Sequence, residues 1–503
     1  MKKMIALILA LTMALSLVAC GSDPAADDKG GEARTDMVMQ LSAEPTSLDY
    51  QQDTSVVTQV MMGNVNACLV TFDADNNIVG ELAETWEWNE DYTQVTFKLR
   101  DGLKFSDGSD LTTADVIYTF QRGIDLGYSD WFSYIKDMKA EDDTTLVLTL
   151  NQPYAIYLNV LALTFFAVMP EGYAESTDLA RGCPVSSGEY YLDNWAVGEN
   201  ITLKANPNYY AGEAAIKDVK FVFIGDENSA LVALETGEID FMQGPGSLSA
   251  TSIEHIDTLD NCATVPNLKE TYTFMGMNAS MPELADPNVR NAIDYAINRD
   301  DLCALSGTAV PAGSMAATKN IAGYQEGFEP RAQDIAKAKE YMAASNYPDG
   351  FKVEIVSGSP AWTKAATVIQ ANLAEIGIEV SLRETDIPTL IADLGSGNYQ
   401  LGICSWGNAN ADVTNNMAMY HPGDAMCFSK ITDSAAYDLL VKSLATTGAE
   451  RDEILKEAFT AMTETVPYVG LFWPSNYYGI NSALQIDLPI GVQGYTLYSM
   501  HWN

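Results

Sequence analysis

Carboxylates are the most abundant side chains in this sequence that could bind a metal ion or act as acid and base. Residues 73–84 carry oxygen ligands at the first, third, fifth and twelfth places, as a calcium-binding loop does. The sixth place of such a loop needs glycine for its sharp turn, and it holds Ile78 here. We therefore expect a hairpin turn at Asn76 and Asn77, which tolerate positive φ, and no calcium site.

Imidazole and thiol groups, the usual ligands of transition metals, are few and widely spaced. The three histidines are His255, His421 and His501, and no two cysteines form a C-x-x-C pair. Zinc sites and disulfide frameworks need closer or repeated spacing, and a nickel or haem site would draw on imidazole. We therefore expect no metal and no cofactor, and we interpret most cysteines as small buried apolar side chains.

Catalytic motifs are also missing from the sequence. G-x-S-x-G, H-E-x-x-H and G-x-x-x-x-G-K-[ST] do not occur. Adjacent acids such as residues 141–143 (Glu-Asp-Asp) lie in a hydrophilic stretch that is typical of a solvated turn. The sequence therefore predicts no catalytic residue. A glycan hydrolase, which would need paired carboxylates in a cleft, is kept only as an alternative.

The start of the chain has the pattern of a secretory signal peptide, residues 1–20. Two lysines precede an apolar run from Met4 to Leu15, and small residues lead to Cys20. The stretch Leu-Val-Ala-Cys that ends at Cys20, followed by Gly21, looks like the lipobox of bacterial lipoproteins, in which the cysteine is acylated. We expect Cys20 to carry a lipid anchor. An ordinary secretory signal with a chance cysteine is the alternative.

The segment that follows Cys20 is expected to remain unfolded. Residues 21–36 contain glycine, proline, alanine and charges but almost no large apolar side chain, so burial cannot offset their ordering entropy. We expect a flexible tether that joins a globular body to the outer face of the cytoplasmic membrane. No stretch beyond the signal peptide reaches the roughly 20 apolar residues that span a bilayer, so we expect no transmembrane helix in the mature chain.

Length, hydrophobic content and net charge limit which class of protein this is and which partners it can bind. With 503 residues, of which 47% are hydrophobic, the chain can bury a large core, and its length indicates several lobes. The formal charge is −40, which repels nucleic acid and anionic lipid headgroups. Such acidity fits a cationic or zwitterionic ligand, but it also serves solubility outside the cell, so charge does not identify the ligand.

Period-two patterns predict strands in the first half of the chain. Apolar and polar side chains alternate at residues 86–88 and 94–100 around a turn at 89–93, which predicts a hairpin with one wet face. Residues 112–115 then form a capping box, so a helix should begin there and end at Gly123. Residues 146–150 and 219–223 alternate in the same way.

Helical patterns become more prominent after residue 267. Asp286 can cap a helix with Pro287 at its first position, and further helices are expected at residues 334–344 and 364–376. Strand-like runs follow the last two helices, at residues 351–356 and 378–382. Helices that alternate with such strands predict a mixed α/β fold with a partly parallel sheet.

Four stretches of the chain resemble the family 5 extracellular solute-binding proteins of ABC importers, which include oligopeptide-, dipeptide- and nickel-binding proteins. The most specific stretch is residues 82–122, with the turn Lys-Phe-Ser-Asp-Gly at residues 104–108 before the capped helix. The others are residues 187–240, 286–299 and 347–353. Together they span nearly all of the chain after the tether, so the resemblance is more specific than a short motif.

The resemblance implies a bilobed α/β clamshell of the large type II class of periplasmic binding proteins, with an extra subdomain. Lobe one would contain residues 37–66, 170–266 and 474–503. The extra subdomain would contain residues 67–169, and lobe two residues 267–473. A ligand that contacts both lobes only in the closed form stabilises closure, and the transporter would recognise that closed form.

Ligand contacts in the family come largely from a tryptophan-containing strand end in lobe two, which residues 404–412 match here. In the peptide binders, the residue three after this tryptophan is an aspartate that pairs with the peptide ammonium group, and this chain has Ala409 instead. A buried ammonium needs a counter-charge, so Asp412 or another acid would have to replace the missing aspartate. Trp406 could bind ligand or belong to the core.

If the ligand is a peptide, the backbone of both lobes should pair with it as an added strand. The predicted ligand-binding residues are therefore Ser405, Trp406, Gly407, Asn408 and Asp412 of lobe two and Thr54, Ser55 and Val56 of lobe one.

The resemblance thus implies a monomeric substrate-binding subunit that captures a solute and delivers it to ABC permease subunits. A short peptide is the first choice of solute. A nickel chelate, an oligosaccharide or another small solute stays open as an alternative, and so does a surface sensor or peptide chaperone without a transport partner.

Overall fold

The computed structural model describes residues 34–53, 55–73, 76–127, 130–243, 248–267, 271–313, 321–408, 410–486 and 495–503. The chain forms a short N-terminal unit, residues 1–34, and one compact unit, residues 35–503. The predicted signal peptide, Cys20 and most of the predicted tether lie outside the described residues, as do Thr54 and Ala409. Asp36, assigned to the tether from sequence, instead begins strand β1 (Asp36–Leu41), because it pairs with Asp218.

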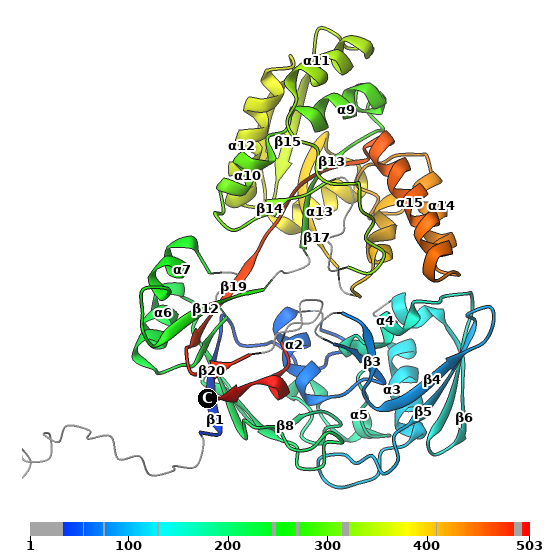
Figure 1. Cartoon of the computed structure of the whole chain (residues 1–503), viewed down its shortest axis with the longest axis vertical. Coiled ribbons are helices and arrows are strands. Elements are labelled where there is room, and N and C mark those ends of the chain that lie inside the picture. The colour runs from blue at the N-terminus through cyan, green and yellow to red at the C-terminus, as the bar shows by residue number, and fades with distance from the viewer. Residues whose placement is uncertain are drawn as a thin grey trace, which may run out of the picture. The chain divides into compact units, whose positions relative to one another are not determined.

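One sheet has seven strands in the order β12-β19-β11-β1-β10-β9-β8 (Figure 1). Strand β1 is parallel to its neighbours β10 and β11, and its Met37, Met39 and Leu41 are buried in the core. Helices α6 and α7 pack against β11, β12 and β19. The elements are α2 (Val56–Val65), β8 (Tyr190–Ala196), β9 (Asn200–Ala205), β10 (Asp218–Phe223), α6 (Glu227–Thr236), β11 (Phe241–Met242), α7 (Ala250–Ile256), β12 (Cys262–Asn267) and β19 (Asn476–Asn481).

A four-stranded antiparallel sheet, ordered β4-β5-β7-β6, is inserted in the chain between β1 and β8. Its β4 and β5 are the predicted hairpin, with Val95, Phe97 and Leu99 buried on one face. The elements are β4 (Ala83–Trp88), β5 (Gln94–Leu99), α3 (Thr113–Leu126), η1 (Asp130–Tyr134), β6 (Ile135–Asp142), β7 (Thr145–Leu150), α4 (Tyr157–Leu161), η2 (Thr164–Phe166), α5 (Tyr173–Ser176) and η3 (Leu179–Arg181).

Helix α3 begins as predicted but ends later. Thr112 and Asp115 form the expected capping box, whereas the helix runs through Gly123 and ends at Gly127, which has a φ of 58°. A β-carbon at Gly123 would lie 2.3 Å from the ring of Phe132. Gly123 therefore serves close packing against an aromatic ring, and the prediction that it stops the helix was wrong.

The stretch that resembles a calcium loop is a hairpin. Strands β2 (Val70–Phe72) and β3 (Ile78–Gly80) pair antiparallel, and Asn76 in the turn has a φ of 61°. The backbone N–H of Asn77 donates to Oδ1 of Asp73 at 2.8 Å. Asp75 lies outside the described residues. The turn predicted at Asn76 and Asn77 is confirmed.

A six-stranded sheet follows β12, in the order β14-β18-β13-β17-β15-β16. Strand β15 is parallel to β16 and β17, as the alternation of helices and strands predicts. The elements are β13 (Thr271–Met277), α8 (Pro282–Ala285), α9 (Pro287–Ala296), α10 (Arg299–Ala304), β14 (Val310–Pro311), α11 (Ile335–Ala344), β15 (Lys352–Ser357), α12 (Pro360–Ala374), β16 (Glu379–Glu384), α13 (Ile387–Ser396), β17 (Leu401–Gly407), η4 (Val413–Tyr420), α14 (Ala435–Ser443), α15 (Gly448–Thr465) and β18 (Tyr468–Trp473).

The helix caps in this part follow the expected chemistry, with one shift. Asp286 caps α9, as predicted, and Asp334, the first residue of a predicted helix, caps α11. Helix α12 begins at Pro360 rather than at Lys364, because the Ser359 side chain accepts a hydrogen bond from the Trp362 backbone and Pro360 suits the first position.

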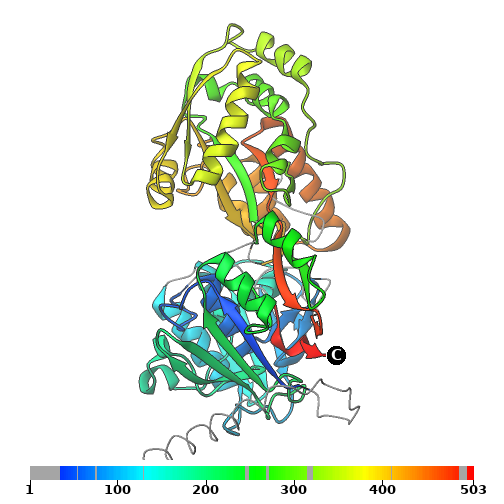
Figure 2. The same ribbon diagram turned by 90° about the vertical axis from the view of Figure 1, so that its left-hand side faces the viewer.

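The chain passes from the seven-stranded to the six-stranded sheet after β12 and returns after β18 (Figures 1 and 2). On one side of the crossing β12 pairs antiparallel with β19, ending at Asn267 and Asn476, and on the other β13 pairs with β18. We call this double crossing the hinge, and we expect it to let the two sheets move relative to one another. The crossings lie near the predicted boundaries between the lobes, which stay a prediction.

The cysteines in the described residues are free thiols, and all except Cys303 are buried. Burial raises the pKa of the Cys183 and Cys404 thiols to about 12, so both stay protonated. Among the described helices, all are too short or too polar to reach across a bilayer. The chain ends with β20 (Leu484–Gln485), η5 (Leu497–Ser499) and β21 (His501–Trp502).

Candidate ligand-binding site

The first part of the predicted tryptophan motif, residues 404–407, forms the end of strand β17, beside the crossing between the two sheets. Gly407, its last residue, pairs with Thr271, the first described residue after the crossing between the sheets. On the opposite side of β17, the ladder with β15 ends at Ser357 and Ile403. Within the described residues, the backbone of residues 404–407 therefore has β13 on one side and no strand partner on the other.

Trp406 and Ser405 are half-buried, and Gly407 is exposed. The Trp406 ring meets the Phe428 ring edge-on, with 6.1 Å between centroids, and packs against the core that contains Phe274. Trp406 thus has one apolar contact with the protein and a surface left for another partner. Its position is compatible with both the packing role and the ligand-binding role that the sequence left open.

Residues 408–416, which we call the site loop, follow β17 directly. Asp412 is fully buried, and both of its carboxylate oxygens lie 2.8 Å from Nη2 of Arg451. Its Oδ1 also accepts hydrogen bonds from the backbone N–H and the hydroxyl of Thr414, at 2.9 and 2.7 Å, which caps η4. Asp412 is therefore an internal partner of Arg451. The prediction that it could replace the missing aspartate does not fit this geometry, and we remove it from the site.

The site loop contacts the part of the chain built on the four-stranded sheet. Nδ2 of Asn159, in α4, donates to the backbone carbonyl of Asn410 at 2.9 Å, and both side chains are buried. Next to this contact, the Ala155 backbone donates to the Leu444 carbonyl at 2.6 Å. Leu444 is part of the hydrophobic core of the four-stranded sheet. Lobe two and the extra subdomain, as predicted from sequence, therefore share an interface at this loop.

The lobe-one residues of the predicted site lie at the start of α2. Ser55 caps this helix: its Oγ accepts from the Thr58 backbone at 3.4 Å, and its own N–H donates to Oδ1 of Asp53 at 2.7 Å. Thr54 and the side chain of Val56 are outside the described residues. Ser55 is exposed, and its hydroxyl donates to Oγ1 of Thr58 at 3.0 Å.

Residues close in sequence to each half of the predicted site contact the same short stretch, α4 and η2. Asn159 in α4 holds the site loop. On the lobe-one side, Nε2 of Gln51 donates to the Phe165 carbonyl at 3.1 Å, and the Thr164 hydroxyl donates to the Gln59 carbonyl at 3.3 Å. Asn410, Gln51 and Gln59, which flank the two predicted groups in sequence, therefore contact one segment.

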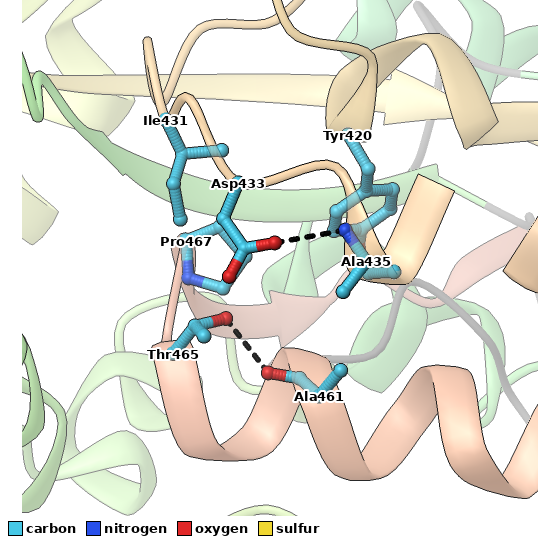
Figure 3. A pocket seen from close by; sticks show the side chains of 8 residues that line it. Tyr420, Ile431, Asp433, Ala435, Ala461, Thr465 and Pro467 are labelled. Carbon is cyan, nitrogen blue, oxygen red and sulfur yellow. Dashed lines mark hydrogen bonds between the residues drawn. The ribbon is translucent and has the colours of Figure 1, made fainter. Parts of the chain in front are cut away.

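Two hollows elsewhere are poor candidates for a solute site. The pocket in Figure 3, between the end of η4, the loop before α14 and the end of α15, has a volume of about 20 Å³ and includes Tyr420 and Pro467. One water molecule would fill it. Along α3, a hollow of about 630 Å³ lies open to solvent beside Arg122, and Arg122 is already paired with Asp49 at 2.6 Å.

No cluster of three or more potential metal ligands occurs within the described residues. His255 lies 3.4 Å from Glu235 on the surface, His421 stacks on Tyr437, and His501 is in β21. The three histidines thus lie on separate elements.

Three side chains at the site were not predicted from sequence: Asn159, Asn410 and Arg451. Asn159 and Arg451 lie about 250 and 40 residues from the loop they hold, so local patterns carried no signal for them. Asn410 belongs to the quoted motif 404–412, but only the structure shows that its carbonyl receives a hydrogen bond from α4.

Residues 77–426 match the family model described as bacterial extracellular solute-binding proteins, family 5. The matched range is more than half of the chain. The chain belongs to this family. As a family 5 member it is a solute-binding protein of an ABC importer and not an enzyme, and the family works outside the cytoplasm.

Individual family 5 relatives align over most of the chain. The glutathione-binding protein GsiB of Escherichia coli is 28% identical over 398 residues, which cover 77% of each chain. The periplasmic binding protein DppA of Helicobacter pylori, solved with the peptide STSA, is 26% identical with a TM-score of 0.76 and covers 93% of this chain and 98% of that one. AgaA of A. tumefaciens, solved with agropinic acid, is 26% identical with a TM-score of 0.75 and covers 93% and 99%. These structures confirm the predicted bilobed α/β clamshell.

Proposed function

We propose that this family 5 protein captures a short peptide between its two lobes and delivers it to the permease subunits of an ABC importer. Separate ATPase subunits would supply the energy, and the binding protein would act as a monomer without a cofactor. The proposed ligand contacts are Ser405, Trp406, Gly407 and Asn408 on one side and Thr54, Ser55 and Val56 on the other.

The main observation behind this proposal is the edge of β17 that has no strand partner. Residues 404–407 have no strand partner on the side that faces away from β13, because the pairing with β15 stops at Ile403. The Gly407 carbonyl accepts from Nδ2 of Asn415 at 3.1 Å, and the other backbone groups of this edge are not paired with a strand. An extended peptide can satisfy such groups by adding as a strand. Backbone pairing gives affinity without strong selection for side chains, which suits a receptor for peptides.

The relatives support the same class of ligand. DppA was solved with a peptide, and GsiB is named for glutathione, itself a small peptide. The complex of AgaA with agropinic acid shows that this fold also holds small solutes that are not peptides. The free strand edge is the feature of this chain that favours a peptide among these choices.

The hinge explains how capture would be signalled to the permease. A peptide bound to both lobes stabilises the closed form by its differential affinity for that form. Because the chain crosses only twice between the two sheets, beside the β12–β19 and β13–β18 pairs, closure would need changes in only a few backbone dihedrals.

A lipid anchor at Cys20 would keep the protein near the permease. The lipobox-like residues 17–20 support this part of the proposal. Replacing Cys20 with serine should move the protein from the membrane fraction to the soluble fraction. A Cys20→Ser protein that stays in the membrane fraction would contradict the anchor.

Calorimetric titration of the purified full chain in mild detergent tests peptide capture. The tetrapeptide Ser-Thr-Ser-Ala should bind and raise the melting temperature, by an amount that corresponds to about 2.7 kcal/mol at a hundredfold excess over Kd. Mixed free serine, threonine and alanine at the same concentration are the control, because they cannot add as a strand. Equal heats from the peptide and the amino acids, or heat from neither, would contradict the proposal.

A further inference from the structure

The loop between α14 and α15 contacts the part of the chain built on the four-stranded sheet. The Ala155 backbone N–H donates to the Leu444 carbonyl at 2.6 Å, and the Tyr92 hydroxyl lies 3.2 Å from the Thr447 hydroxyl. The segments of Tyr92 and Ala155 are adjacent, because the Tyr154 backbone N–H donates to the Tyr92 carbonyl at 3.0 Å. We call Tyr92, Ala155, Leu444 and Thr447 the latch.

The side chain of Leu444 is buried in the core of the other part. Leu444 is 1% exposed and belongs to the hydrophobic core of the four-stranded sheet. Among the buried members of that core in the described chain, all the others come from residues 67–168. Leu440, one helical turn earlier, is buried in the core that contains Phe274. Helix α14 therefore packs one leucine into its own core and the next into the neighbouring core.

The hydroxyl of Thr447 does not serve the local purpose that threonine usually has at this position. Thr447 is the N-cap residue of α15, where a threonine side chain normally accepts a hydrogen bond from the backbone of the first turn. Its side chain makes no such bond here and instead lies within hydrogen-bond distance of Tyr92, 355 residues away in sequence. The latch thus uses a group that would otherwise stabilise the start of α15.

The latch is separate from both the hinge and the proposed ligand contacts. The hinge joins the six-stranded sheet to the seven-stranded sheet, at the crossings after β12 and β18. The latch joins the six-stranded part to the four-stranded sheet instead, and its four residues are not among the proposed ligand contacts. A contact made between protein groups alone favours the closed form whether or not a ligand is bound.

We propose that the part built on the four-stranded sheet, the predicted extra subdomain, serves to hold the molecule closed through the latch. The latch keeps most molecules closed before the ligand binds, and it raises ligand affinity without touching the ligand. The measured Kd is the intrinsic Kd divided by the closed fraction, so a fall of that fraction from about nine-tenths to about one-tenth raises Kd about tenfold. This effect on Kd rests on the proposed capture between two lobes, whereas the latch itself does not.

Hydrogen–deuterium exchange tests the latch without any ligand. The sample is the ligand-free full chain in mild detergent, and fragmentation resolves single amides by mass. The Ala155 amide should exchange at least about tenfold more slowly than an unprotected amide, because its bond to the Leu444 carbonyl exists only while the latch is closed. Leu444→Glu puts a charge into an apolar core, so it should bring this exchange close to the unprotected rate. An unprotected Ala155 amide in the wild type would overturn the proposal.

A matched variant and an internal reference control the exchange experiment. Val441→Glu, in the same helix at a position that is 37% exposed, should keep the protection of the Ala155 amide. Exchange within β5, which pairs with strands on both sides, shows whether the four-stranded sheet stays folded in each variant. If Leu444→Glu does not fold, Leu444→Ala makes the same comparison with a smaller change and should also speed the exchange. Unchanged exchange at Ala155 in a folded Leu444 variant would overturn the latch.

Titration calorimetry with Ser-Thr-Ser-Ala then tests the effect on affinity. Leu444→Glu should raise Kd about tenfold, and Val441→Glu should leave it unchanged. An unchanged Kd in a Leu444→Glu protein that has lost the protection of Ala155 would overturn the role of the latch in affinity. If the wild type does not bind the peptide, peptide capture fails, and the exchange comparison alone decides whether the latch holds the molecule closed.

Discussion

At the residue scale, Trp406 is half-buried, and measurement must decide whether its side chain binds ligand or only packs against the core. Within the described residues its ring has one aromatic neighbour, Phe428, and part of the side chain stays exposed. An aromatic contact with a ligand is worth on the order of 1 to 3 kcal/mol. We expect Trp406→Ala to weaken peptide binding about ten- to a hundredfold in calorimetry, with little change in melting temperature.

A second half-buried tryptophan provides the control for Trp406. Trp88 lies in β4 of the four-stranded sheet, and its ring meets Tyr92 edge-on. Trp88→Ala should leave peptide affinity unchanged. Equal affinities for the wild type and Trp406→Ala, both folded, would assign Trp406 to packing alone.

The ion pair between Asp412 and Arg451 makes a prediction about stability. Replacing Arg451 with methionine leaves a fully buried carboxylate without its partner, which should cost about 3 to 5 kcal/mol in free energy of unfolding. The double variant Asp412→Asn with Arg451→Met removes the charge as well, while Asn retains an acceptor for the Thr414 backbone. Urea unfolding of the two variants should therefore show recovery in the double variant, and an additive loss would contradict the buried pair.

At the scale of elements, helix α3 contains Gly123, whose missing side chain leaves room for the ring of Phe132. An exposed helical glycine replaced with alanine usually gains about 1 kcal/mol. At Gly123 the added β-carbon would lie 2.3 Å from the Phe132 ring, so we expect Gly123→Ala to lose about 1 to 3 kcal/mol instead. Thermal or chemical unfolding measures this loss.

A second substitution, at Phe132, tests whether the clash with its ring causes the expected loss of stability in Gly123→Ala. Phe132→Leu shortens the side chain that meets Gly123, so the penalty of Gly123→Ala should be smaller in that background than in the wild type. The same penalty in both backgrounds would show that the ring is not its cause.

Strand β17 shows how an element can serve two purposes. Its first residues pair on both sides within the six-stranded sheet, and its last residues pair on one side. Because β17 extends beyond its last residue paired with β15, its end leaves one edge without a strand partner. Under the proposed function a peptide would add along this edge, which ends where Gly407 pairs with Thr271 near the crossing between the sheets.

At the scale of the whole molecule, the carboxyl groups of buried Glu81 and half-buried Glu189 hold other parts of the chain, and the contact of Glu189 reaches the C-terminal segment. Oε2 of Glu81 accepts from the Cys68 backbone at 2.7 Å, and Glu189 accepts from the Thr496 hydroxyl at 2.9 Å. Burial raises the pKa of Glu81 to about 8, with a smaller contribution from Glu189, and burial raises the pKa of Glu189 to about 7. Arg100 and Tyr209 act in the opposite direction on the pKa of Glu81.

These raised pKa values make stability depend on pH. In the unfolded chain both groups would lose their protons near pH 4.5, while the folded protein keeps them until pH 7 to 8. The folded state thus binds more protons than the unfolded state between pH 4.5 and pH 7 to 8. The free energy of unfolding therefore falls as the pH rises through this range, by about 1.4 kcal/mol per pH unit for each group. We expect the melting temperature to fall between pH 5 and pH 8.

Glu81→Gln should reduce the slope of this fall, because glutamine does not titrate and its carbonyl can still accept from Cys68. Glu87→Gln, at an exposed position of β4, is the matched control and should keep the slope. Differential scanning calorimetry across this pH range measures both. A flat profile in the wild type, or the same slope in Glu81→Gln, would contradict the assignment.

The sequence by itself determined the family, the mixed α/β class and most of the local elements. Capping boxes, the hairpin around residues 89–93 and the Asn76 turn depend on contacts between near neighbours, which are visible as short patterns. The end of α3 could not be predicted, because the residue that needs Gly123 is Phe132, in another element.

The tertiary structure decided the chemistry of the candidate site. Asp412 is an acid in the motif, and only its contact with Arg451 shows that its charge is already balanced. Asn159 becomes visible only when the site loop is packed against α4. Charge balance and burial depend on groups brought together from distant segments, and a linear pattern does not record which of them meet.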